Sequence, residues 1–384
     1  MNIAILSDTT LWGGLETHAV SLTRGLTILG HRTRIVCTSA ACYALYRSHA
    51  PSDVEVVALQ PPAHASFAGW YRALAAVRAD AVILEKGTLR TGSLAMDLAL
   101  RARFSRFIAI MHLEPEPLPP RRWLFDTLPV TGLWWYRWKL TGLLRSLGPR
   151  FTMCVSEAVR RRLTGDYAFA PRRVVTVANG VDASEFEPDD SVRLTMRREW
   201  GLSADAFVFG AVARLTRVKG FDVAIKAFAR VVAAAGKARP DVYLVLVGTG
   251  EEQAALASEA RDLGIEGRVL FPGFTSNPRR AYQALDVFLI PSRQEAMPLS
   301  LLEAMACGCM AIGTRVGGIP EVITDQDLGV LVESENVDAL AEAMSVAFHL
   351  PTEARQAFGA RARTHVAENF DVRKHWARVA QLVA

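Results

Sequence analysis

Cysteine is scarce in this chain, and long apolar runs are absent from it. The 384 residues include five cysteines, and only the close pair Cys307 and Cys309, on either side of a helix-ending glycine, approaches a metal-ligand spacing. We therefore expect buried, reduced thiols. No stretch reaches the 18 consecutive apolar residues of a transmembrane helix, and no basic, cleavable leader opens the chain. These absences predict a cytoplasmic protein without a membrane span.

A dinucleotide-binding fingerprint is also missing. The loop after the first expected strand reads Ser7-Asp-Thr-Thr-Leu-Trp-Gly13-Gly14 instead of G-x-G-x-x-G, and no carboxylate closes the second strand. This argues against a nicotinamide or flavin enzyme. Gly13 and Gly14 lead instead into a helix expected over 16–29, where backbone N–H groups can approach a phosphate or a sugar.

The composition is that of a globular protein with two cores, since 51% of the residues are hydrophobic and 22% are charged. Strands and helices alternate in the first half, which predicts a doubly wound α/β domain. The strands expected there are 3–7, 34–38, 81–85, 107–112, 151–156 and 174–178. A turn at Asn179-Gly180 marks a boundary. We expect domains over 1–179 and 180–368, followed by a crossover helix over 369–384.

The net charge of +5 is unevenly distributed. Residues 1–179 hold 22 Lys and Arg against 12 Asp and Glu, a net +10, whereas residues 180–384 hold 22 against 27, a net −5. Nucleic acid is the generic partner of a basic half, but no recognition motif accompanies it here. An anionic membrane or an anionic acceptor fits the one-sided charge equally well.

Two loops of the second half place cations and glycine where parallel strands end. Arg214 and Lys219 follow a strand expected over 206–213 and precede a helix that starts near Phe221. Cations beside a helix N-terminus can hold a diphosphate, although the same residues are also typical of a solvated basic loop. Gly248 ends the next expected strand and permits close backbone approach.

Two carboxylates follow the strand expected over 286–291. Glu295 lies in the loop, and Glu303 lies about two turns along a helix for which Pro298 suits the first position and Gly308 suits the end. Their spacing alone is more typical of solvated side chains. Their place at the carboxyl end of a strand, however, is where open α/β sheets bind ligands.

The whole segment 292–322 resembles the Glu-x7-Glu signature of the family 4 retaining glycosyltransferases. Arg214-x4-Lys219 and the Gly13-Gly14-x-Glu turn are similar to further motifs of that family, and the resemblance extends over the whole chain. It implies the GT-B fold, with two Rossmann-like domains facing across a cleft and a C-terminal helix crossing back to the first domain.

The resemblance also implies roles for individual residues. Glu303 would hydrogen-bond the ribose and Glu295 the donor sugar, while Arg214 and Lys219 would hold the diphosphate. With His112, which ends the strand 107–112 near the transferred sugar, Glu295, Arg214 and Lys219 form the catalytic set. The donor-binding residues implied are Gly13, Gly14, Arg214, Lys219, Gly248, Phe274, Glu295, Met297, Pro298, Leu299, Ser300 and Glu303.

No metal and no cofactor are expected besides the nucleoside diphosphate sugar that serves as donor. Asp325 and Asp327 form an Asp-x-Asp, which we interpret as solvated carboxylates in a variable loop. The reaction implied is transfer of a hexosyl unit to a hydroxyl group with retention of configuration, by attack on the face that the phosphate leaves. A nucleotide-sugar 2-epimerase and a non-catalytic nucleotide-sugar-binding protein are the alternatives.

The acceptor prediction depends on residues 117–165. This window contains four of the eight tryptophans. It also contains nine Lys and Arg but only two acidic residues. Interfacial segments combine aromatic rings with cations in this way. We expect the segment from Trp123 to Arg150 to bind an anionic membrane on the inner face, where a lipid-linked acceptor such as lipopolysaccharide or another surface glycan would lie. An ordinary helical core is the alternative.

Overall fold

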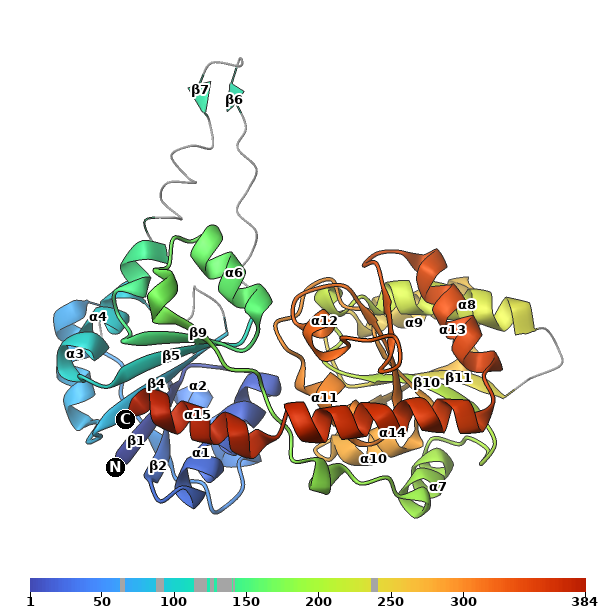
Figure 1. Ribbon diagram of the computed structural model, residues 1–384, viewed down its shortest axis with the longest axis horizontal. Coiled ribbons are helices and arrows are strands. Elements are labelled where there is room, and N and C mark those ends of the chain that lie inside the picture. The colour runs from blue at the N-terminus through green and yellow to red at the C-terminus, as the bar shows by residue number, and fades with distance from the viewer. Residues whose placement is uncertain are drawn as a thin grey trace. The chain divides into compact units, whose positions relative to one another are not determined.

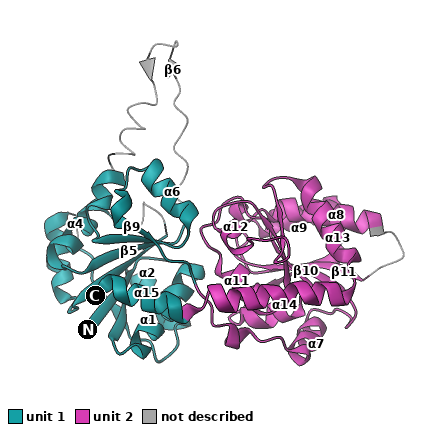
Figure 2. Ribbon diagram, viewed as in Figure 1, with its two compact units in different colours: residues 1–179, 373–384 teal, residues 180–372 magenta. Residues whose placement is uncertain are grey.

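The computed structural model describes residues 1–62, 66–87, 93–113, 123–124, 128–129, 140, 142–235 and 241–384. The chain divides into two compact units (Figure 2). Unit 1 comprises residues 1–179 and 373–384, and unit 2 comprises residues 180–372. The chain therefore passes between the units twice, after Asn179 and after Val372. The C-terminal segment joins unit 1 at Arg373, four residues beyond the expected start of the crossover helix at 369.

Unit 1 is built on a seven-stranded parallel sheet with the order β3-β2-β1-β4-β5-β8-β9. Its strands are β1 (Asn2–Ser7), β2 (Arg32–Cys37), β3 (Val56–Ala58), β4 (Ala81–Lys86), β5 (Phe107–Met111), β8 (Phe151–Cys154) and β9 (Val174–Thr176). The order reverses between β1 and β4, so ligands are expected at the carboxyl ends of these strands. All six predicted strands are present. Sequence reasoning missed β3, which has three residues and no fully buried side chain.

Serine side chains cap several helices of unit 1. The helices of this unit are α1 (Gly14–Ile28), α2 (Ala40–His49), α3 (Phe67–Ala73), α4 (Leu94–Arg103), α6 (Glu157–Gly165) and α15 (Val372–Val383), with 3-10 turns η1 (Leu74–Ala76) and η2 (Pro171–Arg173). The hydroxyls of Ser39, Ser66, Ser93 and Ser156 accept hydrogen bonds from the first turns of α2, α3, α4 and α6. A separate antiparallel pair joins β6 (Trp123–Leu124) to β7 (Leu128–Pro129).

The last helix packs against the first one (Figure 1). A Cβ atom at Gly25 of α1 would lie 2.0 Å from the indole ring of Trp376, so only glycine fits beneath this ring. The indole N–H of Trp376 also donates to Ser21 Oγ at 3.3 Å. The C-terminal helix is thereby fixed in unit 1.

Unit 2 is built on a six-stranded parallel sheet with the order β12-β11-β10-β13-β14-β15. Its strands are β10 (Phe207–Val212), β11 (Val242–Val247), β12 (Val269–Gly273), β13 (Val287–Ile290), β14 (Met310–Thr314) and β15 (Val330–Val332). The order reverses between β10 and β13. The two doubly wound domains predicted from the sequence are confirmed.

Helices cover the sheet of unit 2. They are α7 (Asp190–Glu199), α8 (Phe221–Ala235), α9 (Gln253–Asp262), α10 (Pro278–Ala284), α11 (Leu299–Ala306), α12 (Ile319–Val322), α13 (Val337–His349) and α14 (Thr352–Asn369), with 3-10 turns η3 (Ala183–Phe186), η4 (Arg217–Lys219) and η6 (Glu266–Arg268). Phe207, Phe209, Phe228 and Phe348 pack at tilted or edge-to-face angles in the core beneath α8 and α13.

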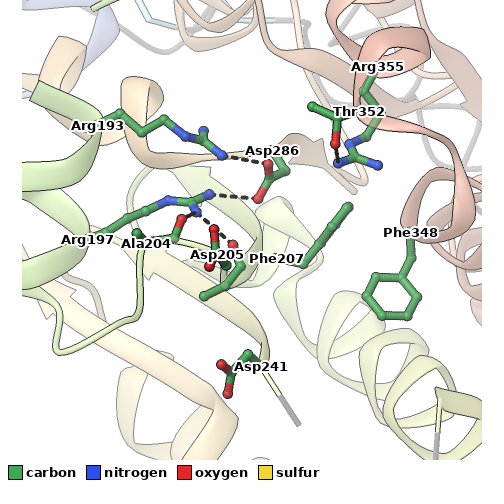
Figure 3. A pocket seen from close by; sticks show the side chains of 11 residues that line it. Arg193, Arg197, Ala204, Asp205, Phe207, Asp241, Asp286, Phe348, Thr352 and Arg355 are labelled. Atoms are coloured by element: carbon green, nitrogen blue, oxygen red, sulfur yellow. Dashed lines mark hydrogen bonds and ion pairs between the residues drawn. The ribbon is translucent and has the colours of Figure 1, made fainter. Parts of the chain in front are cut away.

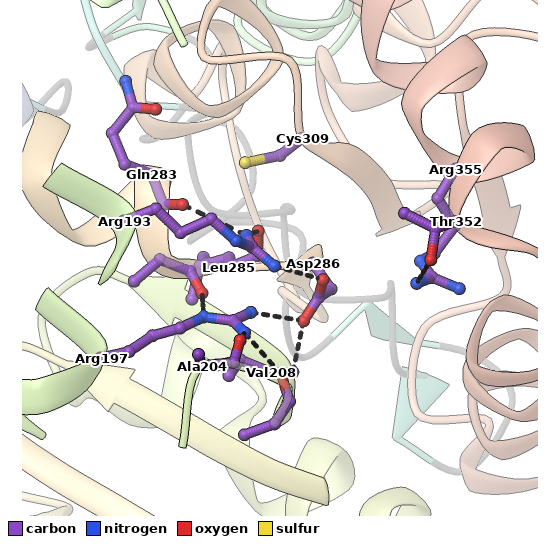
Figure 4. Close-up of polar contacts among 12 residues, drawn as sticks. Arg193, Arg197, Ala204, Val208, Gln283, Leu285, Asp286, Cys309, Thr352 and Arg355 are labelled. Carbon is purple, nitrogen blue, oxygen red and sulfur yellow. Dashed lines mark hydrogen bonds and ion pairs between the residues drawn. The ribbon is translucent and has the colours of Figure 1, made fainter. Parts of the chain in front are cut away.

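A polar network closes the amino-terminal edge of this sheet (Figure 4). Arg193 and Arg197 of α7 each lie 2.7 Å from a carboxylate oxygen of Asp286, and Arg197 also donates to three backbone carbonyls. A cavity of about 480 Å³ borders the network (Figure 3). Because it lies at the strand starts marked by Phe207 and Asp286, opposite the ligand-binding edge, we assign the network a structural role.

Candidate functional site

Three glycines let the loops at the carboxyl edge of the unit 2 sheet pack backbone against backbone. Gly220, Gly248 and Gly317 have positive φ angles of 68°, 139° and 54°. A Cβ atom would lie 2.0 Å from Pro291 O at Gly220, 1.9 Å from Ala213 O at Gly248 and 1.6 Å from Glu295 O at Gly317. These positions require glycine. Gly248 packs against the backbone beside Arg214, and its expected contact with the donor stays a prediction.

Lys219 and Glu295 meet at this edge. Lys219 Nζ, at the end of η4, lies 2.5 Å from Glu295 Oε1, and the hydroxyl of Ser292 donates to the same oxygen at 2.9 Å. The carboxylate side chain is 6% exposed and the lysine side chain 22% exposed. The two predicted residues therefore form one pre-assembled ion pair that faces partly into solvent.

Arg293 fixes the loop that carries Glu295. Its guanidinium forms a two-pronged contact with Asp222 at 2.7 Å and donates to the Arg217 carbonyl at 2.6 Å. A further ion pair joins it to Glu335. Hydrogen bonds that Arg293 donates to Asp222, and then to Glu335, raise the pKa of Arg293 above its ordinary value. This arginine holds the loop after β13 against η4, which keeps Glu295 beside Lys219.

Arg214 differs from Lys219 in its surroundings. It follows β10, is exposed, and has no ion pair within the described ranges. A guanidinium at a strand's carboxyl end is available to an anionic ligand. Arg214 and Lys219 therefore supply one unpaired and one paired cation at the same sheet edge.

Helix α11 carries the remaining predicted contacts of this unit. Pro298 is the N-cap, with φ −73° and ψ 119°, so the helix begins at Leu299 and the expected helical position of Pro298 is wrong by one residue. Met297 is buried, while Leu299 and Ser300 are half-buried in the first turn. The first-turn N–H groups of a helix can bind an anion.

Glu303 lies on α11 and is oriented by a residue that sequence reasoning missed. Tyr282 of α10 donates its hydroxyl hydrogen to Glu303 Oε2 at 2.8 Å. Burial raises the pKa of Glu303, and this hydrogen bond opposes the effect. Burial also raises the pKa of Tyr282 well above its ordinary value. No sequence motif links positions 282 and 303, so the contact depends on how α10 packs on α11.

Phe274 follows β12 and is 54% exposed. The preceding Gly273 has a φ angle of 87°, and its carbonyl accepts a hydrogen bond from Gly248 N at 2.8 Å. The loop after β12 is thereby tied to the loop after β11. The exposed Phe274 therefore follows a backbone contact between the two loops.

The predicted residues of unit 1 lie at the carboxyl edge of its own sheet. Gly13 is the N-cap of α1, and Gly14 is the first helical residue. His112 directly follows β5, and its backbone N–H donates to Lys86 O of the neighbouring strand at 2.9 Å. These residues therefore follow β1 and β5, which flank β4 in the sheet.

His112 belongs to a buried cluster that the sequence did not reveal. Its Nε2 is hydrogen-bonded to Glu85 Oε2, and His18 Nδ1 lies 3.3 Å from Glu85 Oε1. His18 Nε2 lies 2.8 Å from His375 Nε2, and His375 Nδ1 donates to Ala178 O at 2.7 Å. The cluster thus joins α1, β4, β5 and α15 within unit 1.

The charges of this cluster are set by burial and by proximity. Burial alone would raise the pKa of Glu85, but the adjacent His18 and His112 outweigh it and lower the pKa to about 2. Burial lowers the pKa of His375 to about 3. Glu85 is therefore an ionised carboxylate with a neutral His375 nearby at neutral pH.

The same cluster bears on the expectation that no metal is bound. His18, Glu85 and His112 have ligand atoms within 4.8 Å of one another, a set that no local spacing in the sequence predicts. Two imidazoles and a carboxylate are donors that a transition metal can use. In this structure, however, His112 and Glu85 are bonded directly to each other. Asp325 and Asp327 are exposed, as expected.

Two family models match this chain. Residues 12–185 match "Glycosyltransferase Family 4", and residues 192–365 match "Glycosyl transferases group 1". Between them, the matches leave out only the two ends and residues 186–191. The chain belongs to the family 4-type glycosyltransferases.

Similar proteins agree with this placement. N-acetyl-alpha-D-glucosaminyl L-malate synthase of Bacillus anthracis is 35% identical over 51% of this chain and 50% of the relative. A GDP-mannose-dependent phosphatidylinositol monomannoside mannosyltransferase of Mycolicibacterium smegmatis is 32% identical over 60% of this chain and 61% of the relative. These alignments span only half to three fifths of the relatives' lengths.

A solved structure covers the whole chain. The Anabaena HepE protein in complex with UDP-glucose has a TM-score of 0.78 and 21% identity, over 99% of this chain and 98% of that one. At this identity the likeness shows the fold, and the predicted GT-B architecture is confirmed.

Most of the segment expected to meet a membrane lies outside the described residues, including Trp134, Trp135, Arg137, Trp138 and Lys139. None of the helices in the described part of the chain is long and apolar enough to cross a bilayer.

Proposed function

We propose that this protein transfers a hexosyl unit from a nucleoside diphosphate sugar to a hydroxyl group with retention of configuration and without a metal. The observation that carries the proposal is the Lys219–Glu295 pair at the carboxyl edge of unit 2, with Arg214 exposed on the connection after β10 that also carries Lys219. The two cations, Arg214 and Lys219, suit the diphosphate of such a donor, and the carboxylate of Glu295 suits the sugar hydroxyls.

The chemistry follows from these groups. The acceptor oxygen bonds to the anomeric carbon on the face from which the diphosphate departs, the bond from that carbon to the phosphate oxygen breaks, and the acceptor proton moves to the departing oxygen. Lys219 and Arg214 stabilise the negative charge that develops on the diphosphate. Glu295 orients the sugar through its hydroxyl groups, and Glu303 holds the ribose. His112 binds the sugar from unit 1.

A panel of UDP- and GDP-linked sugars tests this proposal. We expect one donor to raise the melting temperature and to release its nucleoside diphosphate when an acceptor is added. The anomeric proton coupling of the product, measured by NMR, should match that of the donor. The variant Glu295→Gln should retain nucleoside diphosphate binding and lose turnover. A product of inverted configuration would contradict the proposal, as would a free 2-epimer formed without acceptor.

We further propose that the acceptor is lipid-linked and that the protein works on the inner face of the cytoplasmic membrane. One relative's name gives a phosphatidylinositol monomannoside, whereas another's gives malate, so both lipid and small-molecule acceptors occur among similar proteins. The basic charge of residues 1–179 favours the lipid, because anionic headgroups attract Lys and Arg by about 1 kcal/mol each.

Exposed leucines give this second proposal a structural basis. Leu140, Leu143, Leu144 and Leu147 are 37% to 55% exposed. Their spacing of i, i+3, i+4 and i+7 places them on one face of the helical turns at 140 and 142–146. An exposed apolar face next to a basic, tryptophan-rich segment is typical of an interfacial helix.

Vesicle co-sedimentation tests the membrane proposal. The parent should bind vesicles with anionic lipid at low salt, and changing Leu143, Leu144 and Leu147 to Ser should weaken binding. The combined change of Trp134, Trp135, Arg137 and Lys139 should do the same and leave nucleotide binding intact. As a control, Leu194→Ser and Leu263→Ser alter leucines of unit 2 that are 42% and 43% exposed. A parent that ignores anionic vesicles and uses a soluble acceptor at full rate would contradict this proposal.

A further inference from the structure

The bond between His112 and Glu85 selects the protonated nitrogen of the histidine ring. Glu85 is an ionised carboxylate and can only accept, so the Nε2 atom that it contacts carries the hydrogen. This leaves Nδ1 as the ring nitrogen for another partner. Glu85 has no exposed side-chain surface, and the side chain of His112 is 6% exposed. The hydrogen bond that determines which ring nitrogen of His112 is protonated is therefore buried.

His18 and His375 are linked by a second series of hydrogen bonds. His375 is neutral and its Nδ1 faces the carbonyl of Ala178, so that nitrogen carries the hydrogen and His375 Nε2 carries a lone pair. His18 Nε2 must then donate to it. Burial lowers the pKa of His18, and its Nδ1 lies 3.3 Å from Glu85 Oε1. Glu85 therefore lies between two imidazoles, and the hydrogen bond from His112 uses its Nε2.

We propose that Glu85, together with His18, is a positioning residue for His112. Glu85 keeps the hydrogen on Nε2 so that Nδ1 is the atom that meets a hydroxyl of the donor sugar. His18 packs edge to face against the His112 ring, with ring centres 4.4 Å apart, and is itself held by His375 of the last helix. The proposal rests on the proposed function, since it assigns the substrate contact of His112 to one ring atom.

The surroundings of Glu85 argue against a role in packing alone. Val82, Ile83 and Leu84 precede it on β4 and are fully buried, so an apolar residue would fit this position without the penalty of a buried charge. The adjacent Lys86 provides a contrast, because its ammonium lies 2.7 and 2.8 Å from the two carboxylate oxygens of Asp97 in a self-contained pair. Glu85 instead lies against two histidines, His18 and His112, and His112 directly follows a strand at the ligand edge.

Histidine NMR tests the proposal without any substrate. In protein labelled with ¹⁵N in its histidines, two-bond ¹H–¹⁵N spectra report which ring nitrogen carries the hydrogen, and a His112→Gln variant assigns the signals. We expect His112 to carry the hydrogen on Nε2 in the parent and to lose this preference in Glu85→Gln. Asp97→Asn breaks the other buried pair and should leave the His112 signals in place. A hydrogen on Nδ1 in the parent, or unchanged signals in Glu85→Gln, would overturn the proposal.

Kinetics provide the second measurement. Glu85→Gln should lower kcat at least tenfold and leave the Kd for UDP or GDP within twofold, because the nucleotide loops belong to unit 2. Equal losses of kcat in Glu85→Gln and in Asp97→Asn would overturn the proposal, since both would then reflect general damage to unit 1. Zinc binding to the parent that disappears in Glu85→Gln would also overturn it. If the parent turned over no nucleotide sugar, the proposed function would fail, and the NMR result would still decide the role of Glu85.

Discussion

The two units share a parallel-sheet architecture but hold their polar groups in different ways. In unit 2, Lys219 and Glu295 come from neighbouring loops and face partly into solvent. In unit 1, Glu85, His18 and His375 are buried, and His112, which directly follows β5, is partly exposed. Under the roles proposed above, unit 2 keeps its charges accessible to an anionic ligand, whereas unit 1 uses a buried charge to orient one residue at the sheet edge.

The largest effect is expected at the accessible cations of unit 2. Lys219→Ala or Arg214→Ala removes a charge-assisted contact that strengthens as the phosphate leaves, and should cost about 2 to 4 kcal/mol in kcat/KM. Initial rates at subsaturating donor measure this loss.

Arg217→Ala is the matched control for these two variants. Arg217 is an exposed cation on the same turn, and its backbone carbonyl, which Arg293 uses, survives the change. Its kcat/KM should stay within threefold of the parent value. Equal losses at all three positions would mean that the loop acts through net charge, and rates within threefold for both Lys219→Ala and Arg214→Ala would remove it from the site.

The same contrast explains what could be predicted from the sequence. Most strands were predictable because they include short apolar runs, although β3 was missed. The loop and helix after β13 were predictable because Glu295, Pro298, Glu303 and Gly308 lie in one contiguous segment. The cluster of unit 1 was not predictable, since positions 18, 85, 112 and 375 have no common spacing and meet only when α15 packs on α1. Tyr282 was missed for the same reason.

The second expected effect concerns the glycines that bring the unit 2 loops together. Gly317→Ala should destabilise the protein by about 1 to 3 kcal/mol and displace Glu295, because the added Cβ would lie 1.6 Å from Glu295 O. Gly264→Ala is the control, since Gly264 has a similar φ of 68° and no atom within 4 Å of the added Cβ. Chemical denaturation of both variants separates backbone strain from collision. Equal losses in the free energy of unfolding for the two variants would show that the loop accommodates the added methyl group without displacing Glu295.

The third effect tests the buried charges of unit 1 through pH. The pKa of His375 is lowered to about 3 by burial, so the unfolded chain takes up a proton below pH 6.5 that the folded chain does not. The free energy of unfolding should therefore fall as the pH falls from 6.5 toward 3, by about 1.4 kcal/mol per pH unit for this group. The lowered pKa of Glu85 adds a further loss between about pH 4.5 and 2.

Urea unfolding at pH 7, 6 and 5 measures this dependence. His375→Asn should flatten it, whereas His349→Asn, at an exposed position of unit 2, should leave it unchanged. A parent whose stability rises on acidification over this range would show that His375 is charged when folded.

The smallest effect is expected from removing metal ions. Asp325 and Asp327 are exposed, and Asp327 lies 3.8 Å from Arg361, so changing both to Asn should leave turnover nearly intact. Excess EDTA should also have little effect, because the proposed function assigns stabilisation of the leaving charge to Lys219 and Arg214. The two treatments distinguish the units. Loss of activity with EDTA but not with the double variant would direct attention to His18, Glu85 and His112, the metal-capable set in the described part of the chain. Loss with both would implicate the Asp-x-Asp loop, and a strict requirement for manganese or magnesium would contradict metal-independent transfer.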